Sequence, residues 1–264
     1  MINSVVGSVV IFNPSWVLLE ATIRTFLTSC PESQIVVWDN SPIDKTSEKL
    51  KVFGRKVTYI KSLANVGYGK GHNSVFNYIK GNCDFFAILN PDLEIPEMSM
   101  GMLLNYMQEH PRYGLASASI FGLDGKPHAV HKPAPTIWRY LRILLGRKFK
   151  CIALSKEIEN PFFPLPEQPI EVPLVSGCFM LFRSNHYKDL GGFDEAFFLY
   201  FEDYDISLRS FNAGKSIVIP HVKIFHNWER ASHKRFNLLT IHIKSAWKFY
   251  TKWGFGLRLR KISI

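Results

Sequence analysis

Three carboxylates stand close together in the second half of the sequence, at Glu202, Asp203 and Asp205. Like charges at this spacing repel one another unless a cation, a helix N-terminus or a bound proton offsets them. A carboxylate held in such a place can accept a proton from a hydroxyl group, which is general-base chemistry. A helix that begins near Glu202 would also bring Asp205 and Arg209 onto a common face. The alternative is an ordinary acidic first helical turn, and these residues by themselves leave it open.

A second set of candidates follows apolar segments that have the composition of buried strands. Asn90 and Asp92 come directly after the uncharged run at 85–89, and His226 follows the apolar pair at 224–225. A carboxylate at a strand tip is well placed to hold a divalent cation that bridges two phosphates. Asp92 could instead cap the helix expected at 96–108, and a single histidine more often has a structural role.

The stretch from Asn65 to Asn73 contains three glycines at the start of a helix expected over 66–80. Its spacing is not that of a dinucleotide-binding fingerprint, and the sequence contains no GxxxxGK[ST] phosphate loop. Glycines that open a helix nevertheless let backbone amides approach an anion closely. A plain helix start explains the same residues, so this stretch is informative only together with others.

The elements that must position these residues alternate between strands and helices. Strands are expected at 5–12, 34–38, 57–60, 84–89, 114–121 and 216–220, and helices at 15–29, 44–53, 66–80, 96–108, 202–212 and 238–253. This alternation predicts an α/β fold with a mostly parallel central sheet flanked by helices. Residues 122–170 contain seven prolines that interrupt any period, which is typical of a functional loop region.

Polar side chains follow each of the first four expected strands. They are Asn13, Asp39 with Asn40, Asn65, and Asp92. Ligands of such sheets bind at the carboxyl ends of the strands. One polar cluster at a strand end would be ordinary turn chemistry, but four on one edge predict a binding site.

The 264 residues, of which 47% are hydrophobic and 20% charged, suffice for one large folded domain. No apolar stretch reaches the roughly 18 residues of a membrane-spanning helix, and no basic residue precedes Arg24 as a signal peptide would require. We therefore expect neither an integral membrane protein nor a secreted precursor. Cys30, Cys83, Cys151 and Cys178 form no CxxC pair and predict free thiols in a reducing cytoplasm.

The net charge of +10 is concentrated near the end of the sequence, where residues 221–264 carry 10 Lys and Arg against one acidic residue. Such a segment usually meets phospholipid, nucleic acid or a phosphorylated substrate, although a solvated helix face has the same pattern. The rest of the chain is nearly neutral and has no recognition motif, so no nucleic acid is expected as a partner. Apolar and aromatic residues interleave with the basic ones. This pattern predicts either peripheral attachment to an anionic membrane surface or packing on the rest of the chain.

Taken in order, these motifs resemble glycosyltransferase family 2, and within it the bacterial rhamnosyltransferase-like enzymes of O-antigen and capsule assembly. The motifs are VVIFNP at 9–14, VVWDNS at 36–41, NVG at 65–67, GHN at 71–73, LNPD at 89–92, SGCFM at 176–180, GFDE at 192–195 and FEDYD at 201–205. The resemblance covers residues 4–228 and implies a GT-A fold. It divides the domain at 1–230 into a nucleotide-sugar-binding half at 1–121 and an acceptor-binding, catalytic half at 122–230, followed by a basic amphipathic segment at 231–264.

The resemblance also implies roles for single residues. The nucleotide-sugar would contact Asn13, Asp39, Asn40, Asn65, Gly67, Asn73, Asn90 and Asp92. Asn90 and Asp92 stand where the family has a DxD motif, so that Asp92 and His226 would hold Mg²⁺ or Mn²⁺. Asp203 would be the catalytic base. The acceptor-side wall of the active site would consist of Gly177, Glu202, Asp205 and Arg209.

The implied activity is transfer of a sugar with inversion, and rhamnose from dTDP-rhamnose is the first candidate. The acceptor would be a hydroxyl of a polyprenol-diphosphate-linked glycan, which places the enzyme in the cytoplasm against the inner face of the cell membrane. A UDP-hexose donor is the second candidate. Asn90 in place of aspartate leaves a further interpretation open, a non-catalytic protein that binds a nucleotide-sugar or polyanion.

Overall fold

The computed structural model describes residues 4–127, 166–227 and 236–255. The strands are β1 (Val5–Ile11), β2 (Gln34–Asp39), β3 (Val57–Lys61), β4 (Phe85–Leu89), β5 (Leu93–Glu94), β6 (Leu115–Phe121), β7 (Phe179–Arg183) and β8 (Ser216–His226). The helices are α1 (Trp16–Ser29), α2 (Ser47–Leu50), the 3₁₀ turn η1 (Lys51–Lys56), α3 (Tyr68–Tyr78), α4 (Ser99–Glu109), α7 (Ser184–Asp189), α8 (Glu202–Asn212) and α9 (Phe236–Trp253).

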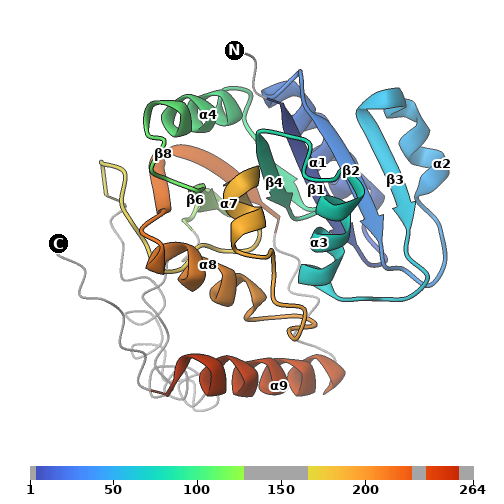
Figure 1. Ribbon diagram of the computed structural model, residues 1–264. Coiled ribbons are helices and arrows are strands. Elements are labelled where there is room, and N and C mark those ends of the chain that lie inside the picture. Colours follow the sequence, from blue (N-terminus) through green and yellow to red (C-terminus); the bar gives the residue numbers. More distant parts are fainter. Residues whose placement is uncertain (1–3, 128–165, 228–235, 256–264) are drawn as a thin grey trace.

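These strands form one eight-stranded sheet in the order β3-β2-β1-β4-β7-β6-β8-β5 (Figure 1). The four strands from β3 to β4 are parallel to one another, as the alternation of the sequence predicts. β7 then runs antiparallel to both β4 and β6, and β8 returns to the direction of β6. The α/β fold is confirmed, with its antiparallel pairs confined to the second half of the sheet.

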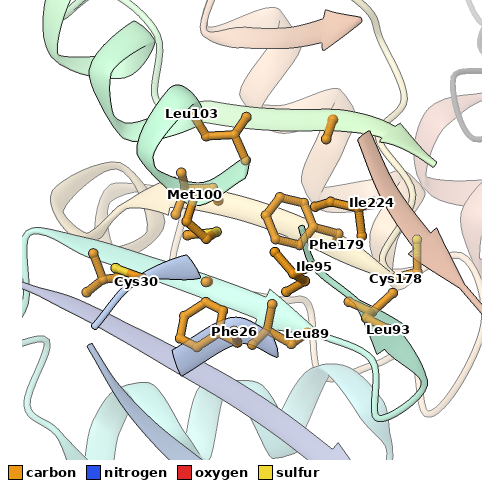
Figure 2. Close-up of a cluster of buried hydrophobic side chains, with 14 of the residues drawn as sticks. Phe26, Cys30, Leu89, Leu93, Ile95, Met100, Leu103, Cys178, Phe179 and Ile224 are labelled. Carbon is orange, nitrogen blue, oxygen red and sulfur yellow. The ribbon is translucent and has the colours of Figure 1, made fainter. Parts of the chain in front are cut away.

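The central strands are buried on both faces, and alternate side chains feed two cores. Val9, Ala87 and Leu89 point into the core beneath α1 and α4, which Figure 2 shows around Phe26, Met100 and Phe179. Phe86 and Ile88 of β4 point into a second core with Val75 and Phe76 of α3, Tyr187 of α7 and Ile206 of α8. Helices thus cover both faces of the sheet, which is why its strands are almost wholly apolar.

Two elements differ from the sequence-based expectation for local reasons. The helix expected at 44–53 is a four-residue helix followed by a 3₁₀ turn, in which Gly54 adopts a positive φ of 54°. β8 continues past Pro220 to His226 because the pairing with β6 skips residues 220–222 between Ile219 and Lys223. Proline cannot donate a hydrogen bond to a strand, and a bulge of this kind accommodates it.

The last described helix, α9, is packed on the domain. Its Ala246, Phe249 and Tyr250 are buried against Phe197 and Phe201 of the segment that leads into α8. The division predicted at residue 231 therefore separates two segments that share a core. No helix in the described residues is long and apolar enough to cross a membrane.

Some expectations fall outside the described residues. These include the thiol of Cys151, most of the proline-rich region, and the basic residues before and after α9. Cys30, Cys83 and Cys178 are free thiols, as predicted, and Cys30 and Cys178 are buried.

Candidate active site

One edge of the sheet collects residues from distant parts of the sequence. β4 ends at Leu89, β8 ends at His226 and β7 begins at Phe179. Because β7 is antiparallel to β4 and β6, and β8 is parallel to β6, these three points lie on the same edge as the ends of β1, β2 and β3. The loops that carry Asp92 and Gly177 therefore meet there.

Asp92 and His226 are in direct contact at this edge. His226 Nε2 lies 3.0 Å from Asp92 Oδ1 and 3.3 Å from Asn90 Nδ2. The short strand β5 sets this geometry, since its Leu93 is paired with His226 of β8. The side chains of His226 and Asp92 are only 10% and 19% exposed. The structure thus joins a pair that lies 134 positions apart in the sequence.

This pair has the chemistry of a partial metal site. Carboxylate oxygen and imidazole nitrogen are both ligands of Mn²⁺, and the amide of Asn90 adds a third polar group. Within the described residues, no third His, Cys, Asp or Glu joins them. A divalent cation held here would need water or phosphate oxygens for its remaining positions, which suits a cation that is bound together with a diphosphate.

Asp203 lies in the first turn of α8, against the loop before β7. Its Oδ2 accepts a hydrogen bond from the backbone N–H of Gly177 at 3.1 Å, and its Oδ1 accepts one from the N–H of Tyr204 at 2.9 Å. A Cβ at Gly177 would stand 3.0 Å from the Cβ of Asp203, so this close approach favours glycine. Tyr200 and Phe201 just before α8 have positive φ angles of 70° and 68°, a strained conformation for non-glycine residues. The backbone therefore bends sharply directly before the helical turn that contains Asp203.

The three neighbouring carboxylates differ in how their negative charge is stabilised or avoided. Asp203 accepts the backbone N–H groups of Gly177, in the loop before β7, and of Tyr204, in the first turn of α8. Glu202 is buried, and its burial together with the charge of Asp203 raises the pKa of Glu202 well above its ordinary value. Its Oε2 makes no hydrogen bond to the described residues, which further favours the protonated form of Glu202 over the carboxylate. Asp205 is neutralised by cations.

Asp205 and Arg209, which were predicted for the acceptor-side wall, make their contacts with each other and with neighbouring elements of the domain. Asp205 is fully buried, and its carboxylate accepts hydrogen bonds from Arg209 Nε at 2.9 Å and from Trp253 Nε1 at 2.9 Å. Lys252 Nζ lies 2.7 Å from the same carboxylate. Arg209 also donates to the carbonyl oxygens of Leu190 and Gly192. Both residues thus hold α9 and a neighbouring turn in place.

The part of this edge that was predicted to bind the nucleotide is built around Asp39 and Asn40, at the end of β2. Both are buried. Asp39 accepts hydrogen bonds from the hydroxyl of Tyr59 at 2.8 Å and from the N–H of Ser41 at 2.7 Å. Asn40 donates to the carbonyl oxygen of Gly67 at 3.0 Å, which ties β2 to the start of α3.

The glycine-rich stretch forms the neighbouring loop. Asn65 Oδ1 accepts the N–H of Gly67 at 3.0 Å, and Gly67 has a φ of 91°. A Cβ at Gly67 would lie 2.3 Å from the carbonyl oxygen of Phe198, so only glycine fits between these two loops. Asn13 also has a positive φ, of 49°, and its N–H donates to Ser41 Oγ at 2.7 Å. These residues cluster at one edge, as the sequence predicts.

Asn73, which was predicted to contact the nucleotide-sugar, binds residues of the segment at 187–195. Its Oδ1 accepts hydrogen bonds from the Tyr187 hydroxyl at 2.7 Å and the Phe193 N–H at 2.9 Å. Its Nδ2 donates to the carbonyl oxygen of Phe193 at 2.8 Å and lies 3.2 Å from Glu195 Oε1. The buried amide is thus fully engaged in holding α3 against the segment at 187–195.

Tyr68 and Cys178 lie between the Asp92–His226 pair and Asp203, although neither was predicted to be a site residue. The Tyr68 hydroxyl lies 2.6 Å from the carbonyl oxygen of Gly177 and 3.1 Å from Asn90 Oδ1. Burial raises the pKa of Cys178 to about 12, and the charges of Asp92 and Asp203 add to that rise. Burial raises the pKa of Tyr68 well above its ordinary value too, with contributions from Glu202, Asp203 and Asp92. The only cue in the sequence is that each residue stands beside a glycine of a recognised motif.

A cavity of about 370 Å³ lies elsewhere, at the opposite ends of β4 and β7, where it is lined by Asp84, Arg183 and Lys215 among others. None of the predicted site residues lines it.

The protein is similar to known transferases over most of its length. It is 26% identical over 232 residues to "N-acetylglucosaminyl-diphospho-decaprenol L-rhamnosyltransferase" from Mycobacterium tuberculosis (strain CDC 1551 / Oshkosh), covering 81% of this chain and 73% of the relative. It is 25% identical over 234 residues to "Rhamnosyltransferase WbbL" from Escherichia coli (strain K12), covering 83% and 82% of the two chains.

Solved structures share the fold at low sequence identity. The structure of GalNAc-T7 with UDP, GalNAc and Mn²⁺ superposes with a TM-score of 0.68 at 13% identity, over 96% of this chain and 48% of that chain. The mannosyltransferase PcManGT from Pyrobaculum calidifontis, in complex with GDP-Man and Mn²⁺, gives a TM-score of 0.60 at 14% identity, over 86% and 57% of the two chains. This chain therefore spans about half the length of those structures. These likenesses show the GT-A fold that the motifs predict.

The family model described as Glycosyl transferase family 2 matches residues 8–191, which is well over half of the 264 residues. The match includes the loops that carry Asp39, Gly67, Asp92 and Gly177. The chain belongs to glycosyl transferase family 2.

Proposed function

We propose that this protein transfers a sugar with inversion from a nucleotide-diphosphate donor to a hydroxyl of a lipid-linked surface-polysaccharide intermediate. The observation that carries the proposal is the meeting, at one edge of the sheet, of the Asp92–His226 pair and the Asp203 carboxylate. Rhamnose from dTDP-rhamnose is the first candidate, because two relatives are named as rhamnosyltransferases and one name includes a decaprenol-diphosphate acceptor. A UDP-hexose is the second candidate, in line with the relative named "Low-salt glycan biosynthesis hexosyltransferase Agl10" from Haloferax volcanii.

In the proposed reaction, Asp203 acts on the acceptor side of the reacting carbon, and Asp92 and His226 act on the side of the departing diphosphate. Asp203 accepts the proton of the acceptor hydroxyl as that oxygen attacks the sugar. Asp92 and His226, with Asn90, would hold Mg²⁺ or Mn²⁺, which would supply positive charge to the departing diphosphate. A single displacement places the attacking and leaving oxygens on opposite sides of the carbon, so the product is inverted. Base and cation from separate loops suit that requirement.

The nucleotide would lie along the ends of β1, β2 and β3. Asp39 and Asn40 are held rigidly by Tyr59 and Gly67, which fixes the polar groups that would meet base and ribose. Asn13 and Asn65 stand on the neighbouring loops. Burial and the charge of Asp203 raise the pKa of Glu202, which favours the protonated form of Glu202 and so disfavours a second negative charge beside the proposed base.

The proposed membrane partner would meet the outer face of α9. Lys252 is paired with Asp194 and Asp205, and Lys248 donates to the carbonyl oxygen of Ala196, so these two lysines bind the domain. The opposite face exposes Leu239, Ile243 and Trp247 at four-residue spacing, with exposed fractions of 54%, 55% and 65%. An apolar, Trp-bearing helix face is suited to a membrane interface, which fits an enzyme of the cytoplasmic side with a polyprenol-linked acceptor.

Liposome co-sedimentation tests this attachment without removing α9, whose inner face is part of the core. The double variant Ile243→Ser with Trp247→Ser should lose binding to anionic vesicles. Val17→Ser, which removes an apolar side chain that is 72% exposed on α1, is the matched control and should bind as the unchanged protein does. Equal binding by both variants, or no binding by the unchanged protein, would remove the membrane partner from the proposal.

A donor screen tests the transferase activity. Purified protein is incubated with dTDP-rhamnose or UDP-hexoses, a lipid-diphosphate acceptor and Mn²⁺, and release of nucleoside diphosphate is followed. Release should stop with EDTA and should fall on the order of 10²-fold in Asp92→Asn. Full activity after thorough chelation would refute the metal role. Donor binding without turnover of any donor would favour the non-catalytic interpretation.

A further inference from the structure

We infer that Tyr68 is a positioning residue that determines which atom of the Asn90 amide faces the cation site. The inference rests on the proposed function, because it assigns a purpose to the Asn90 side chain only where a cation is bound beside Asp92 and His226. It concerns a residue that lies outside that pair and outside the Asp203 turn.

Tyr68 lies in a continuous chain of polar contacts from one centre to the other. The Asp203 carboxylate accepts the Gly177 N–H, and the Gly177 carbonyl oxygen lies 2.6 Å from the Tyr68 hydroxyl. The same hydroxyl is 3.1 Å from Asn90 Oδ1, and Asn90 Nδ2 is 3.3 Å from His226 Nε2. One side chain therefore touches the loop of the base and the loop of the metal ligands.

The proton count of the Tyr68 hydroxyl decides how it can act. A neutral phenol has one O–H to donate and can also accept. The Gly177 carbonyl oxygen is an acceptor only and lies closer than Asn90, so the proton goes to Gly177. Toward Asn90 the hydroxyl is then free to accept, and its best partner is the amide NH₂ group.

An amide can meet that demand by a half-turn about its last side-chain bond, which exchanges the positions of Oδ1 and Nδ2. With Nδ2 toward His226, Asn90 presents a donor to a place where Asp92 and His226 would hold a cation. After the half-turn, Nδ2 donates to the Tyr68 oxygen and Oδ1 faces His226 and Asp92. An amide oxygen is an acceptable ligand for Mg²⁺ or Mn²⁺, whereas an amide NH₂ group is not.

The Tyr68 ring is fixed well enough to give this direction. Its ring centroid lies 4.5 Å from that of His72 in an edge-on contact and 6.2 Å from that of Phe193. Its backbone N–H donates to the carbonyl oxygen of Phe198 at 2.9 Å. Removing the hydroxyl alone leaves these contacts in place, so Tyr68→Phe isolates the polar role.

The test is a double-mutant cycle that measures Mn²⁺ affinity by electron paramagnetic resonance, on the full chain with dTDP present. Tyr68→Phe should weaken Mn²⁺ binding about tenfold, the usual scale for the loss of a group that orients a ligand. In an Asn90→Asp background the two oxygens are equivalent and need no orientation. The same Tyr68→Phe change should there alter the affinity by less than about twofold.

Tyr78→Phe is the matched control, because it removes the hydroxyl of a tyrosine that is 58% exposed at the far end of the same helix. It should leave Mn²⁺ affinity unchanged. Equal losses from Tyr68→Phe in both backgrounds, or no loss in the Asn90 background, would overturn the inference and leave the proposed function standing. A wild-type protein that binds no Mn²⁺ with dTDP would overturn both.

Discussion

Phe249 of α9 lies fully buried against the segment that delivers Asp203, and its replacement by alanine measures how firmly that helix belongs to the domain. The Phe249 ring packs 5.3 Å from the ring of Phe201 and 6.0 Å from that of Tyr204, between centroids. Phe201 and Tyr204 flank the Glu202–Asp203 pair. The substitution therefore acts on the residues that support Asp203, the proposed base, and leaves Asp203 itself unchanged.

The expected cost follows from burial. Truncating a buried phenylalanine to alanine costs about 3–5 kcal/mol, because transfer of the ring and the cavity left behind both count. Since proteins are stable by about 5–15 kcal/mol, Phe249→Ala should remove a large part of the free energy of unfolding. Trp247→Ala, two positions away on the outer face and 65% exposed, should change it by less than about 0.5 kcal/mol.

Urea unfolding followed by circular dichroism and by tryptophan fluorescence gives both numbers. The two probes should report one cooperative transition, since α9 shares a core with the domain. Equal and small effects of the two substitutions, or a separate early transition that Phe249→Ala abolishes, would show that α9 is an independent appendage. α9 would then not support the turn that carries Asp203.

Three further changes test other parts of the site. Burial raises the pKa of Glu202 above its unfolded-state value, so the folded state holds an extra proton and the free energy of unfolding falls as pH rises from about 4.5. In Glu202→Gln, the free energy of unfolding measured between pH 5 and 8 should fall less steeply. Burial lowers the pKa of His72 to about 3, so stability should fall as pH drops below about 6.5, with a slope of up to about 1.4 kcal/mol per pH unit that His72→Gln lacks. Gly67→Ala puts a Cβ against the Phe198 carbonyl oxygen at positive φ, so it should lower the free energy of unfolding on the order of 1–3 kcal/mol and weaken dTDP binding in calorimetry. The control Gly101→Ala has open space in α4 and should leave the free energy of unfolding unchanged or raise it.

Much of the fold could be predicted from the sequence because its signals are local. The uncharged run of β4 and the alternation of strands and helices specify a covered, largely parallel sheet. The position of β7 between β4 and β6, antiparallel to both, could not be predicted in this way. The apolar residues 179–182 could form a strand next to any strand of a buried sheet. Likewise, Pro220 indicates the end of a strand, and only the bulged pairing with β6 lets β8 continue to His226.

The site residues that directly follow a strand could be located from the sequence. The residues whose side chains have several possible contacts in the folded protein could not. Asp92 and His226 follow strands, and the structure places them in contact. Asp205 belongs to the same acidic cluster as Asp203, yet a helical turn directs the two to different neighbours, so Asp205 meets Lys252 and Trp253 of α9. Residue spacing in one helix could not reveal a partner 48 positions away.

In the proposed reaction, Asp203 removes the acceptor proton, and the loops on the other side of the site bind the donor independently of Asp203. The most direct measurement compares turnover with donor affinity in Asp203→Asn, using dTDP-rhamnose, Mn²⁺ and a polyprenol-diphosphate-linked acceptor. We expect kcat to fall by a factor on the order of 10² or more, while the donor Kd from calorimetry stays within about twofold. Near-normal turnover in Asp203→Asn, or a loss of donor affinity as large as the loss of turnover, would contradict this expectation.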